Sequence, residues 1–390
     1  MNDPNNSVNY NQSQLISRAN VLKSLGIHSP ATIKQLANRA RLSKPTVTKS
    51  ISQLEELGLV NSKGHRDQPK GRKPALYGLS EEHYWLGVDL EIPDLRIAVY
   101  DLSNRLVKSK ADLVGMEGEF ENVEEELPRK LIEQIGGFLD RQDISTDSIL
   151  GIGVGVPGMV KGGYFRPFSR LKNTPDISLA KPIEEAFGLP VVIGNDVDLE
   201  LLAELDRRDL LEEPGVVAVY LAARPSKAAD YSVRLGGSVF HLGNTLQGAI
   251  GSANEFGHTS VARTDFEQDT CNCGNPKCLE TFVNHKLAEN GSDKPTAEIA
   301  EALSYKLRDL VFLYNPSLLV VDLLAFPRMV NPVMNNLEEF IQLRRKQLGT
   351  DGPEVTTPGD SEMACARGAC IKSFRNLTVN PEKYSHLHLD

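Results

Sequence analysis

The chain has 390 residues, enough for two or three domains that each bury a core. Hydrophobic residues make up 40% and charged residues 24%, as in a soluble globular protein, and no apolar run approaches the length of a membrane span. The formal net charge of −9 is unevenly distributed, because residues 1–80 hold 12 Lys+Arg and 4 Asp+Glu, a net +8, which leaves −17 for the rest. A basic head on an acidic body is typical of a DNA-binding module attached to another domain.

The amino terminus, MNDPNNSVNYNQSQ, is polar and lacks the apolar core of a secretory signal. We therefore expect a cytoplasmic protein, in which cysteine thiols stay reduced. Residues 1–10 are expected to be disordered.

Three short helices are predicted within the first 60 residues. The first has apolar residues at helical spacing from Leu15 onward and ends at Gly26. The second is expected to begin with Ser29 as its N-cap and Pro30 as its first helical residue, and the third to have Ser43 as its N-cap. Three short helices joined by tight turns are typical of a helix-turn-helix.

The start of the third helix is polar and basic. Its predicted exposed residues are Ser43, Lys44, Thr46, Thr48, Lys49 and Ser50. Lysines suit phosphates or guanine edges, and hydroxyls suit base edges or phosphates. The alternative interpretation is a helical protein-interaction module with a solvated basic face.

A strand starting near Val60 and a basic hairpin over residues 63–74 follow the three helices. The hairpin indicates the wing of a winged helix, and Arg72 and Lys73 at its base are candidates for minor-groove contact. The wing favours DNA binding over protein interaction. Residues 77–82 are expected to form the linker to the body.

The next segment is predicted to form a β-β-β-α-β unit. Its strands are expected at 84–90, 95–100, 106–113 and 149–156, with a helix at 124–139. The last strand is rich in glycine and ends in Pro157-Gly158. A dinucleotide-binding fingerprint would need a helix directly after the glycines, whereas Pro157-Gly158 indicates a turn. A plain buried strand and a strand end that shapes a ligand pocket both remain open.

A short apolar strand over residues 191–194 ends in Asn195 and Asp196, and a helix to about Arg207 follows. Polar groups at the carboxyl end of a strand in an α/β sheet lie where ligands bind. Asp196 is also a candidate N-cap of the helix, and the two roles are compatible.

Three of the five cysteines lie within eight residues, as Cys271-x-Cys273-x4-Cys278, and His258 lies upstream. Three thiolates and one imidazole form a closed tetrahedral set for Zn²⁺, which is typical of a structural metal. Gly274 permits the sharp turn after Cys273. A disulfide with one spare thiol is the alternative, which a reducing compartment disfavours.

Two carboxylates bracket this cysteine motif: Glu255 precedes His258 by three residues, and Glu280 follows Cys278 by two. If zinc joins the two ends of the loop, Glu255, His258 and Glu280 can converge on one pocket. Carboxylates beside an imidazole suit a polyhydroxylated ligand, because each hydroxyl both donates and accepts. Either glutamate alone would be a solvated loop charge.

The motif Glu-x-Gly-His at 255–258, followed by Cys-x-Cys-Gly-x-x-x-Cys-Leu-Glu at 271–280, resembles the ROK family of sugar kinases and sugar-responsive repressors. The resemblance extends from about Leu15 to Ser373, and Lys277 stands where the family usually has Gly. It implies an N-terminal winged helix-turn-helix, which the kinases lack, followed by a two-lobed α/β body of the actin/hexokinase, ribonuclease H-like type. The implied domains are residues 11–80, residues 83–195 with about 362–378 as the first lobe, and residues 196–361 as the second lobe with the zinc motif.

The same resemblance implies a sugar site and a reason to expect no catalysis. The implied sugar ligands are Asn195, Asp196, Glu255, His258 and Glu280, and the aspartate is the catalytic base in the kinases. Three loops that would hold ATP are altered: Asp89–Asp94 has no glycine, Leu221–Arg234 is a longer polar segment without glycine, and residues 318–321 run into Asp322.

We therefore expect a sugar-responsive transcriptional regulator, a repressor, that is not an enzyme. It would hold a structural zinc and bind double-stranded operator DNA as a homodimer or higher homo-oligomer. A phosphate on the sugar would lie away from the pocket carboxylates, near Arg224 or Lys227. The alternatives are a ROK sugar kinase with a regulatory DNA-binding head, and a repressor controlled by a protein partner.

Overall fold

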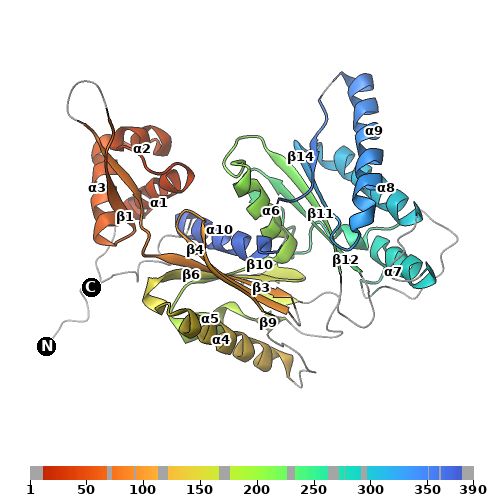
Figure 1. Ribbon diagram of the computed structural model, residues 1–390, viewed down its shortest axis with the longest axis horizontal. Coiled ribbons are helices and arrows are strands. Elements are labelled where there is room, and N and C mark those ends of the chain that lie inside the picture. Colours follow the sequence, from red (N-terminus) through yellow and green to blue (C-terminus); the bar gives the residue numbers. More distant parts are fainter. Residues whose placement is uncertain are drawn as a thin grey trace.

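The computed structural model (Figure 1) describes a winged head followed by a body with two mixed sheets. The residues that it describes are 12–67, 73–91, 94–112, 122–166, 176–225, 233–261, 271, 273–275, 277–290, 297–349, 351–359 and 362–379.

The head contains three helices and a two-stranded wing. The helices are α1 (Gln12–Ile27), α2 (Ile33–Ala40) and α3 (Lys44–Glu56), and the wing strands are β1 (Val60–His65) and β2 (Ala75–Leu79). The strands pair antiparallel, and Tyr77 of β2 also bridges to Ala31 ahead of α2. Leu22, Leu36 and Ile51 bring one buried residue from each helix into a common core. The predicted winged helix-turn-helix is confirmed.

Two details of the head differ from the sequence prediction. Thr32, and not Ser29, is the N-cap of α2, because its hydroxyl and the Gln35 side chain form a reciprocal capping box. Ser43 caps α3 as predicted, accepting a hydrogen bond from the Thr46 amide at 3.3 Å. Strand β2 continues to Leu79, so the predicted linker over residues 77–82 is too long, and the strand β3 of the body begins only five residues after β2 ends.

The first sheet of the body has the strand order β10-β6-β3-β4-β5. Its strands are β3 (Tyr84–Glu91), β4 (Asp94–Asp101), β5 (Leu106–Asp112), β6 (Ile149–Val156) and β10 (Val191–Asn195). Helices α4 (Val123–Gln142) and α5 (Ala180–Phe187) cover one face, and α10 (Ala364–Val379), near the end of the chain, covers the other (Figure 1). A small three-stranded sheet, β7 (Met159–Lys161), β8 (Tyr164–Arg166) and β9 (Ile177–Ser178), follows β6.

The glycines of β3 and β6 let α10 lie directly on the sheet. A Cβ added at Gly87 would come within 2.0 Å of the Ala366 carbonyl oxygen, and one added at Gly153 within 2.2 Å of the Ala369 carbonyl oxygen. No side chain fits between the sheet and this helix backbone. The glycine-rich strand therefore serves helix packing, and no helix opens behind it to bind a dinucleotide.

The second sheet has the strand order β13-β12-β11-β14-β15. Its strands are β11 (Val217–Pro225), β12 (Val233–His241), β13 (Asn244–Thr245), β14 (Leu318–Asp322) and β15 (Glu354–Thr356). Helices α7 (Leu279–Asn290), α8 (Ala297–Tyr314) and α9 (Val330–Leu348) lie on one side, and α6 (Asp196–Arg207) lies on the other, towards α10 (Figure 1). Of the predicted glycine-free segment from Leu221 to Arg234, residues 221–225 and 233–234 belong to the paired strands β11 and β12, and residues 226–232 lie outside the described residues.

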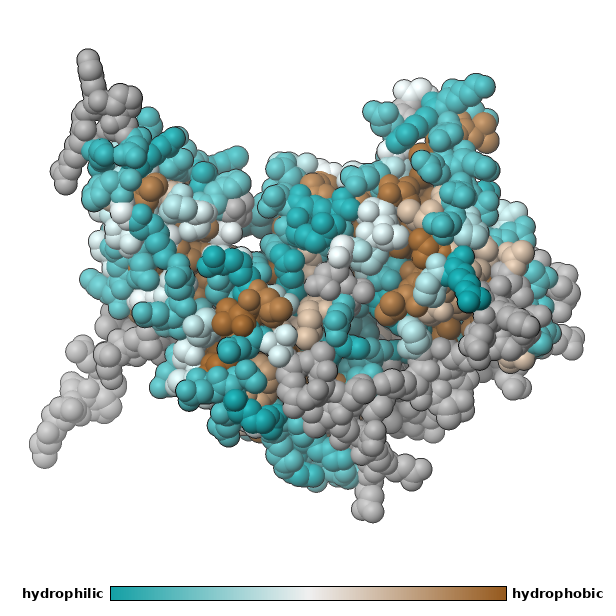
Figure 2. All heavy atoms as spheres, viewed as in Figure 1, coloured by the Kyte–Doolittle hydropathy of each residue, from teal (hydrophilic) through white to brown (hydrophobic). Residues whose placement is uncertain are grey.

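The head rests on the body through α1. Gly26 packs against the ring of Phe374 on α10, and Lys23 forms a 2.6 Å ion pair with Glu212, which follows α6. In Figure 2 the head forms a separate, mainly hydrophilic bulge on the left of the surface. None of the described helices is both long and apolar enough to span a membrane.

Candidate ligand pocket and metal centre

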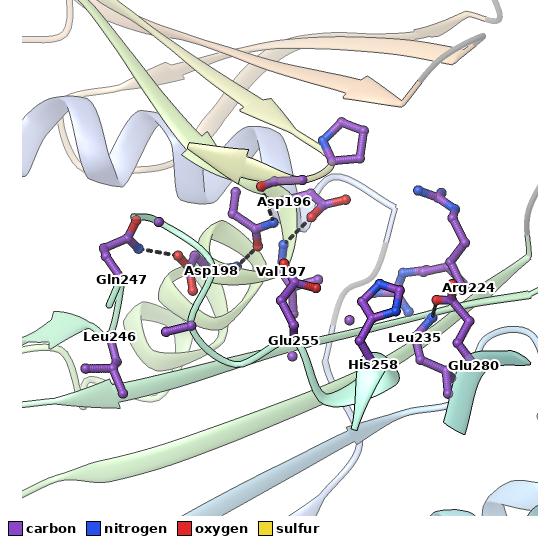
Figure 3. A pocket seen from close by; sticks show the side chains of 18 residues that line it. Asp196, Val197, Asp198, Arg224, Leu235, Leu246, Gln247, Glu255, His258 and Glu280 are labelled. Atoms are coloured by element: carbon purple, nitrogen blue, oxygen red, sulfur yellow. Dashed lines mark hydrogen bonds between the residues drawn. The ribbon is translucent and has the colours of Figure 1, made fainter. Parts of the chain in front are cut away.

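A polar pocket lies between the two sheets and collects all five residues that the sequence predicted as sugar ligands (Figure 3). Pro157, Gly158 and Asn195 line it from the first sheet, at the carboxyl ends of the parallel strands β6 and β10. The remaining lining comes from the start of α6, from Arg224 of β11, from β12, from the segment after β13 and from the start of α7. We call this cavity the interlobe pocket.

Asn195 and Asp196 are fixed by the junction of β10 and α6. Asn195, and not Asp196, is the N-cap of α6, since its Oδ1 accepts from the Asp198 amide at 3.1 Å. Its Nδ2 donates to the Gly158 carbonyl at 3.1 Å, which connects the end of β10 to the turn after β6 that lines the pocket. Asp196 Oδ1 accepts from the Val197 amide at 2.9 Å, and its carboxyl group faces the pocket in Figure 3.

Asp198 and Gln247 also line the pocket, although the sequence analysis did not single them out. Asp198 is buried and accepts hydrogen bonds from Ser238 Oγ, at 2.5 Å, and from Gln247 Nε2. The spacing Asn-Asp-x-Asp at the start of α6 was the available signal, because residues two apart at a helix start can both face a pocket above it. The partners of Asp198 lie 40 or more residues away in sequence, so they could not be inferred locally.

Glu255, His258 and Glu280 form the opposite wall of the pocket. Glu255 directly precedes the short 3₁₀ helix η2 (Phe256–His258), His258 is the last residue of η2, and Glu280 lies in the first turn of α7. Glu280 Oε2 accepts from the Leu235 amide at 2.8 Å, which joins α7 to β12. In Figure 3 the side chains of His258 and Glu280 lie at one end of the pocket and Gln247 and Asp198 at the other.

Burial raises the pKa of three carboxyl groups in the pocket, so each of them stays protonated to a higher pH than it would in water. Desolvation, opposed by Arg234, raises the pKa of Asp196 to about 6. Desolvation and then the charges of Asp196 and Glu280 raise the pKa of Glu255 to about 7. Desolvation also raises the pKa of Glu280 to about 7. Carboxyl groups poised near neutrality in a cleft are typical of a functional site.

The four predicted metal ligands come together beside the pocket. One ligand atom from each of His258, Cys271, Cys273 and Cys278 lies within 4.8 Å of the others, and none of these cysteines is in a disulfide. Cys273 Sγ and Cys278 Sγ are 3.2 Å apart, and Cys271 Sγ lies 3.5 Å from His258 Nδ1. These spacings suit a tetrahedral ion bound at about 2.0–2.3 Å from each ligand.

The surroundings of the cluster also fit a bound cation. Gly274 has φ +87°, which allows the turn between Cys273 and Asn275, and the Asn275 amide points at Cys273 Sγ from 3.3 Å. Burial raises the pKa of the Cys278 thiol well above its usual range, so a cation is required to hold it as a thiolate. Because His258 Nδ1 faces the thiols, Nε2 is the ring nitrogen that a ligand in the interlobe pocket can meet.

Ion pairs surround the two arginines, Arg224 and Arg234, that line the interlobe pocket. Glu91 at the end of β3 pairs with Arg96 at 3.3 Å and with Arg234 of β12, so it joins the two sheets. Arg224 pairs with Glu200 at 2.8 Å and with Asp322 at 2.6 Å. Arg224 belongs to the pocket lining itself, and Lys227 lies outside the described residues, so the position of a sugar phosphate near them stays a prediction.

On the head, most predicted DNA-contacting residues are accessible. The exposed ones are Ser43, Lys44, Thr48, Lys49 and Lys73, Thr46 is half-buried, and Arg72 lies outside the described residues. Lys73 pairs with Asp67 at 2.5 Å. The prediction that Ser50 is exposed is wrong: it is only 3% exposed and faces the core.

Comparison with known proteins agrees with this architecture. Residues 85–297 match the ROK family, and residues 16–67 match the MarR family. A xylose repressor of Caldicellulosiruptor bescii is 26% identical over 280 residues, which are 70% of this chain and 64% of that protein. An N-acetylglucosamine repressor of Escherichia coli is 24% identical over 283 residues, again 70% of this chain and 64% of the relative. The match therefore spans less than two thirds of the length of these relatives.

Solved structures share the fold at lower sequence identity. A ROK family transcriptional regulator, described as a homolog of the E. coli MLC protein, superposes with a TM-score of 0.72 at 17% identity, covering 96% of this chain and all of that one. A ROK hexokinase from Thermus thermophilus gives 0.55 at 23% identity over 76% of this chain and 100% of its own. The first comparison includes the winged head, and the family match covers more than half of the sequence. The chain belongs to the ROK family.

Proposed function

We propose that the protein is a sugar-responsive transcriptional repressor. Its winged head would bind operator DNA, and a sugar or sugar derivative in the interlobe pocket would change that binding. The observation that carries the proposal is the combination of an accessible basic recognition helix with a pocket that gathers Asn195, Asp196, Glu255, His258 and Glu280. Two repressors named for sugars, xylose and N-acetylglucosamine, are among its relatives.

The proposed sugar ligands come from both sides of the pocket. Asn195 and Asp196 follow the first sheet, whereas Glu255, His258 and Glu280 belong to the segment that packs on the second. A sugar that bonds to both sides favours one relative position of the sheets, and it shifts the equilibrium by its difference in affinity for the two positions. The head contacts α10 on the first sheet and Glu212 beyond α6, so such a movement would change how the head is held.

Zinc would act as a structural ion in this protein. His258, Cys271, Cys273 and Cys278 would hold it, leaving no open coordination position for catalysis. The ion would connect η2, which contains His258 and directly follows Glu255, to the start of α7, which carries Glu280. The three side chains would then keep their mutual positions in the pocket.

We further propose that the repressor binds its operator as a homodimer in the cytoplasm. One winged helix buries too little surface for tight specific binding, whereas a dimer reads two half-sites. Exposed apolar side chains on α8 and α9 offer a surface for pairing: Phe312 is 63% exposed, Leu313 73% and Leu343 54%. Residues 11–80 would be the DNA-binding domain, and residues 83–195 with about 362–378 and residues 196–361 would be the two lobes.

A sugar kinase with a regulatory DNA-binding head is the alternative, since Asp196 occupies the position of the kinase base. Against it, the ion pairs of Glu91 with Arg234 and of Arg224 with Asp322 place fixed charges beside the pocket. ATP binding would have to displace or rearrange these pairs. We therefore propose that the protein has no kinase activity.

The test begins with a thermal-shift screen of monosaccharides and amino sugars, free and phosphorylated, on zinc-loaded protein. A specific ligand raises the unfolding temperature through mass action. The stabilising sugar is then incubated with the protein and Mg-ATP. If the protein is a repressor, at least one sugar should stabilise it, and no phosphorylated sugar should form above background. Formation of a phosphorylated sugar would establish the kinase instead.

A further inference from the structure

A second cavity lies where the winged head meets the body. Helix α1 of the head borders it through Lys23 and Gly26, and the last turns of α10, which lies beside α1 in Figure 1, border it from the body. The segment that follows α6 contributes Leu211 and Glu212 to the lining. The cavity has a volume of about 130 Å³ and shares no lining residue with the interlobe pocket. We call it the junction cavity.

The wall of the junction cavity offers apolar surface that is already held in place. Leu211 and Phe374 are half-buried and Val379 is 74% exposed, so all three keep accessible surface. The Phe374 ring packs edge-on against Trp85, with the ring centroids 6.1 Å apart, and a Cβ added at Gly26 would come within 3.0 Å of the same ring. An apolar cavity of about 150 Å³ accommodates one benzene molecule. The junction cavity therefore suits a ligand whose apolar body is about the size of one ring.

The charged side chains around the junction cavity neutralise one another. Glu212 pairs with Lys23 of the head at 2.6 Å and with Arg375 of α10 at 3.1 Å. Asp206 pairs with another arginine of α10 at 2.7 Å. With Asp209, which also lines the cavity, three carboxylates stand against three cations, and no net charge is left for an ionic ligand to neutralise. An ion would lose hydration on entering without gaining a counter-charge, so the surroundings favour an uncharged ligand.

We propose that the junction cavity is a second ligand site, for a small uncharged molecule with an apolar body about the size of one ring, and that a bound ligand holds the head against the body. Such a ligand lies between Gly26 of α1 and Phe374 of α10, so the head cannot separate from the body without releasing it. The site itself does not depend on sugar sensing. Its effect on operator affinity rests on the DNA-binding function proposed above.

Isothermal titration calorimetry of the full-length, zinc-loaded protein tests the ligand class. The uncharged probes are toluene, indole and benzyl alcohol, and benzoate and benzylammonium are ionic probes of similar size. We expect a Kd of about 0.1–1 mM for at least one uncharged probe, as about eight apolar heavy atoms imply, and at least about tenfold weaker binding of both ions. Ions that bind as tightly as the uncharged probes would overturn the proposal. So would the absence of binding by every uncharged probe up to about 5 mM.

Filling the cavity tests where the probe binds. Leu211→Trp places a larger ring in the cavity and should weaken binding of the uncharged probe by at least about tenfold, and Thr378→Trp on α10 should do the same independently. Leu324→Trp, at an exposed position after β14, is the matched control and should keep Kd within about twofold of the wild-type value. Circular dichroism and zinc content check that each variant is folded. Wild-type affinity in both cavity variants would place the probe elsewhere and overturn the site.

Amide hydrogen exchange tests whether the ligand holds the head. Amides of α1 that exchange only when the head leaves the body should slow by one plus the ratio of free probe concentration to Kd, about tenfold at about ten times Kd. Amides of α9, which does not line the cavity, should keep their rates. Unchanged exchange throughout α1 with the probe bound would overturn the proposed effect on the head. Neither measurement uses sugar or DNA, so failure of the repressor function and failure of this site give different results.

Discussion

Replacing Asp196 by asparagine should make the ligand-free protein more stable while removing its response to sugar. Burial raises the pKa of this carboxyl from 3.8 to about 6, so ionisation is unfavourable in the folded state. At about 1.4 kcal/mol per pH unit, the difference corresponds to roughly 3 kcal/mol of destabilisation. Asparagine has the same shape and no charge, and its Oδ1 can still accept from the Val197 amide.

The sign of the pH dependence follows from the direction of this shift. The folded protein holds the Asp196 proton more tightly than the unfolded chain does, so the destabilisation is complete above about pH 6 and fades as the pH falls towards 3.8. The gain from Asp196→Asn should therefore be largest at pH 8, at roughly 2–3 kcal/mol, and about half as large at pH 5. The loss of Coulombic attraction to Arg234 is already included in the raised pKa.

Urea unfolding of zinc-saturated protein at pH 8 and pH 5 measures this difference. Asp147→Asn, at an exposed position in the turn before β6, is the control and should change the free energy of unfolding by less than about 0.5 kcal/mol at either pH. A loss of stability in Asp196→Asn at pH 8 would refute the reasoning. So would an unchanged thermal response to the stabilising sugar, because the carboxylate is proposed to bind it.

Three further outcomes are expected. Cys273→Ser should lower the zinc content from about one ion per chain and weaken sugar binding more than DNA binding. Metal analysis measures the zinc content and calorimetry the sugar affinity. An unchanged sugar affinity in metal-free protein would contradict this. Lys49→Ala should weaken binding to all DNA sequences and reduce the slope of log affinity against log salt by about one, whereas Lys346→Ala on α9 should not. Lys23→Ala should alter the unfolding temperature little, because the 2.6 Å ion pair with Glu212 is solvent-accessible. The same substitution should reduce the effect of sugar on operator affinity. An undiminished sugar effect would show that this contact does not couple the head to the body.

The parts of the site that the sequence predicted are those encoded by short local patterns. The cysteine spacing with His258 identified the His/Cys cluster that could hold a metal, and a strand ending in Asn195-Asp196 identified the pocket edge, because both rules depend on residues close together in the chain. Arg234 and Gln247 escaped notice because their partners, Glu91 and Asp198, are brought near only by the packing of the two sheets and α6.

Two errors in the head show where local patterns were misread. Ser50 lies three residues after Val47 and four before Leu54, so its helical position is on the buried stripe, and the sequence contained that information. Ser29-Pro30 matches the more familiar N-cap pattern, but the capping box belongs to Thr32, because the Gln35 that completes it follows Thr32 by three residues.

The most direct test of the account measures operator affinity by fluorescence anisotropy, with and without the stabilising sugar, for the wild-type protein and for Glu255→Ala. Glu255 lines the pocket and lies far from the head in sequence, so it should affect DNA only through the sugar. We expect sugar to change the operator affinity of the wild-type protein by at least about fivefold, a typical coupling between two sites. We also expect that Glu255→Ala abolishes the change while unliganded affinity stays within a few fold of wild type. A sugar response that persists in Glu255→Ala and in Asp196→Ala would contradict the account, because the effector would then bind elsewhere.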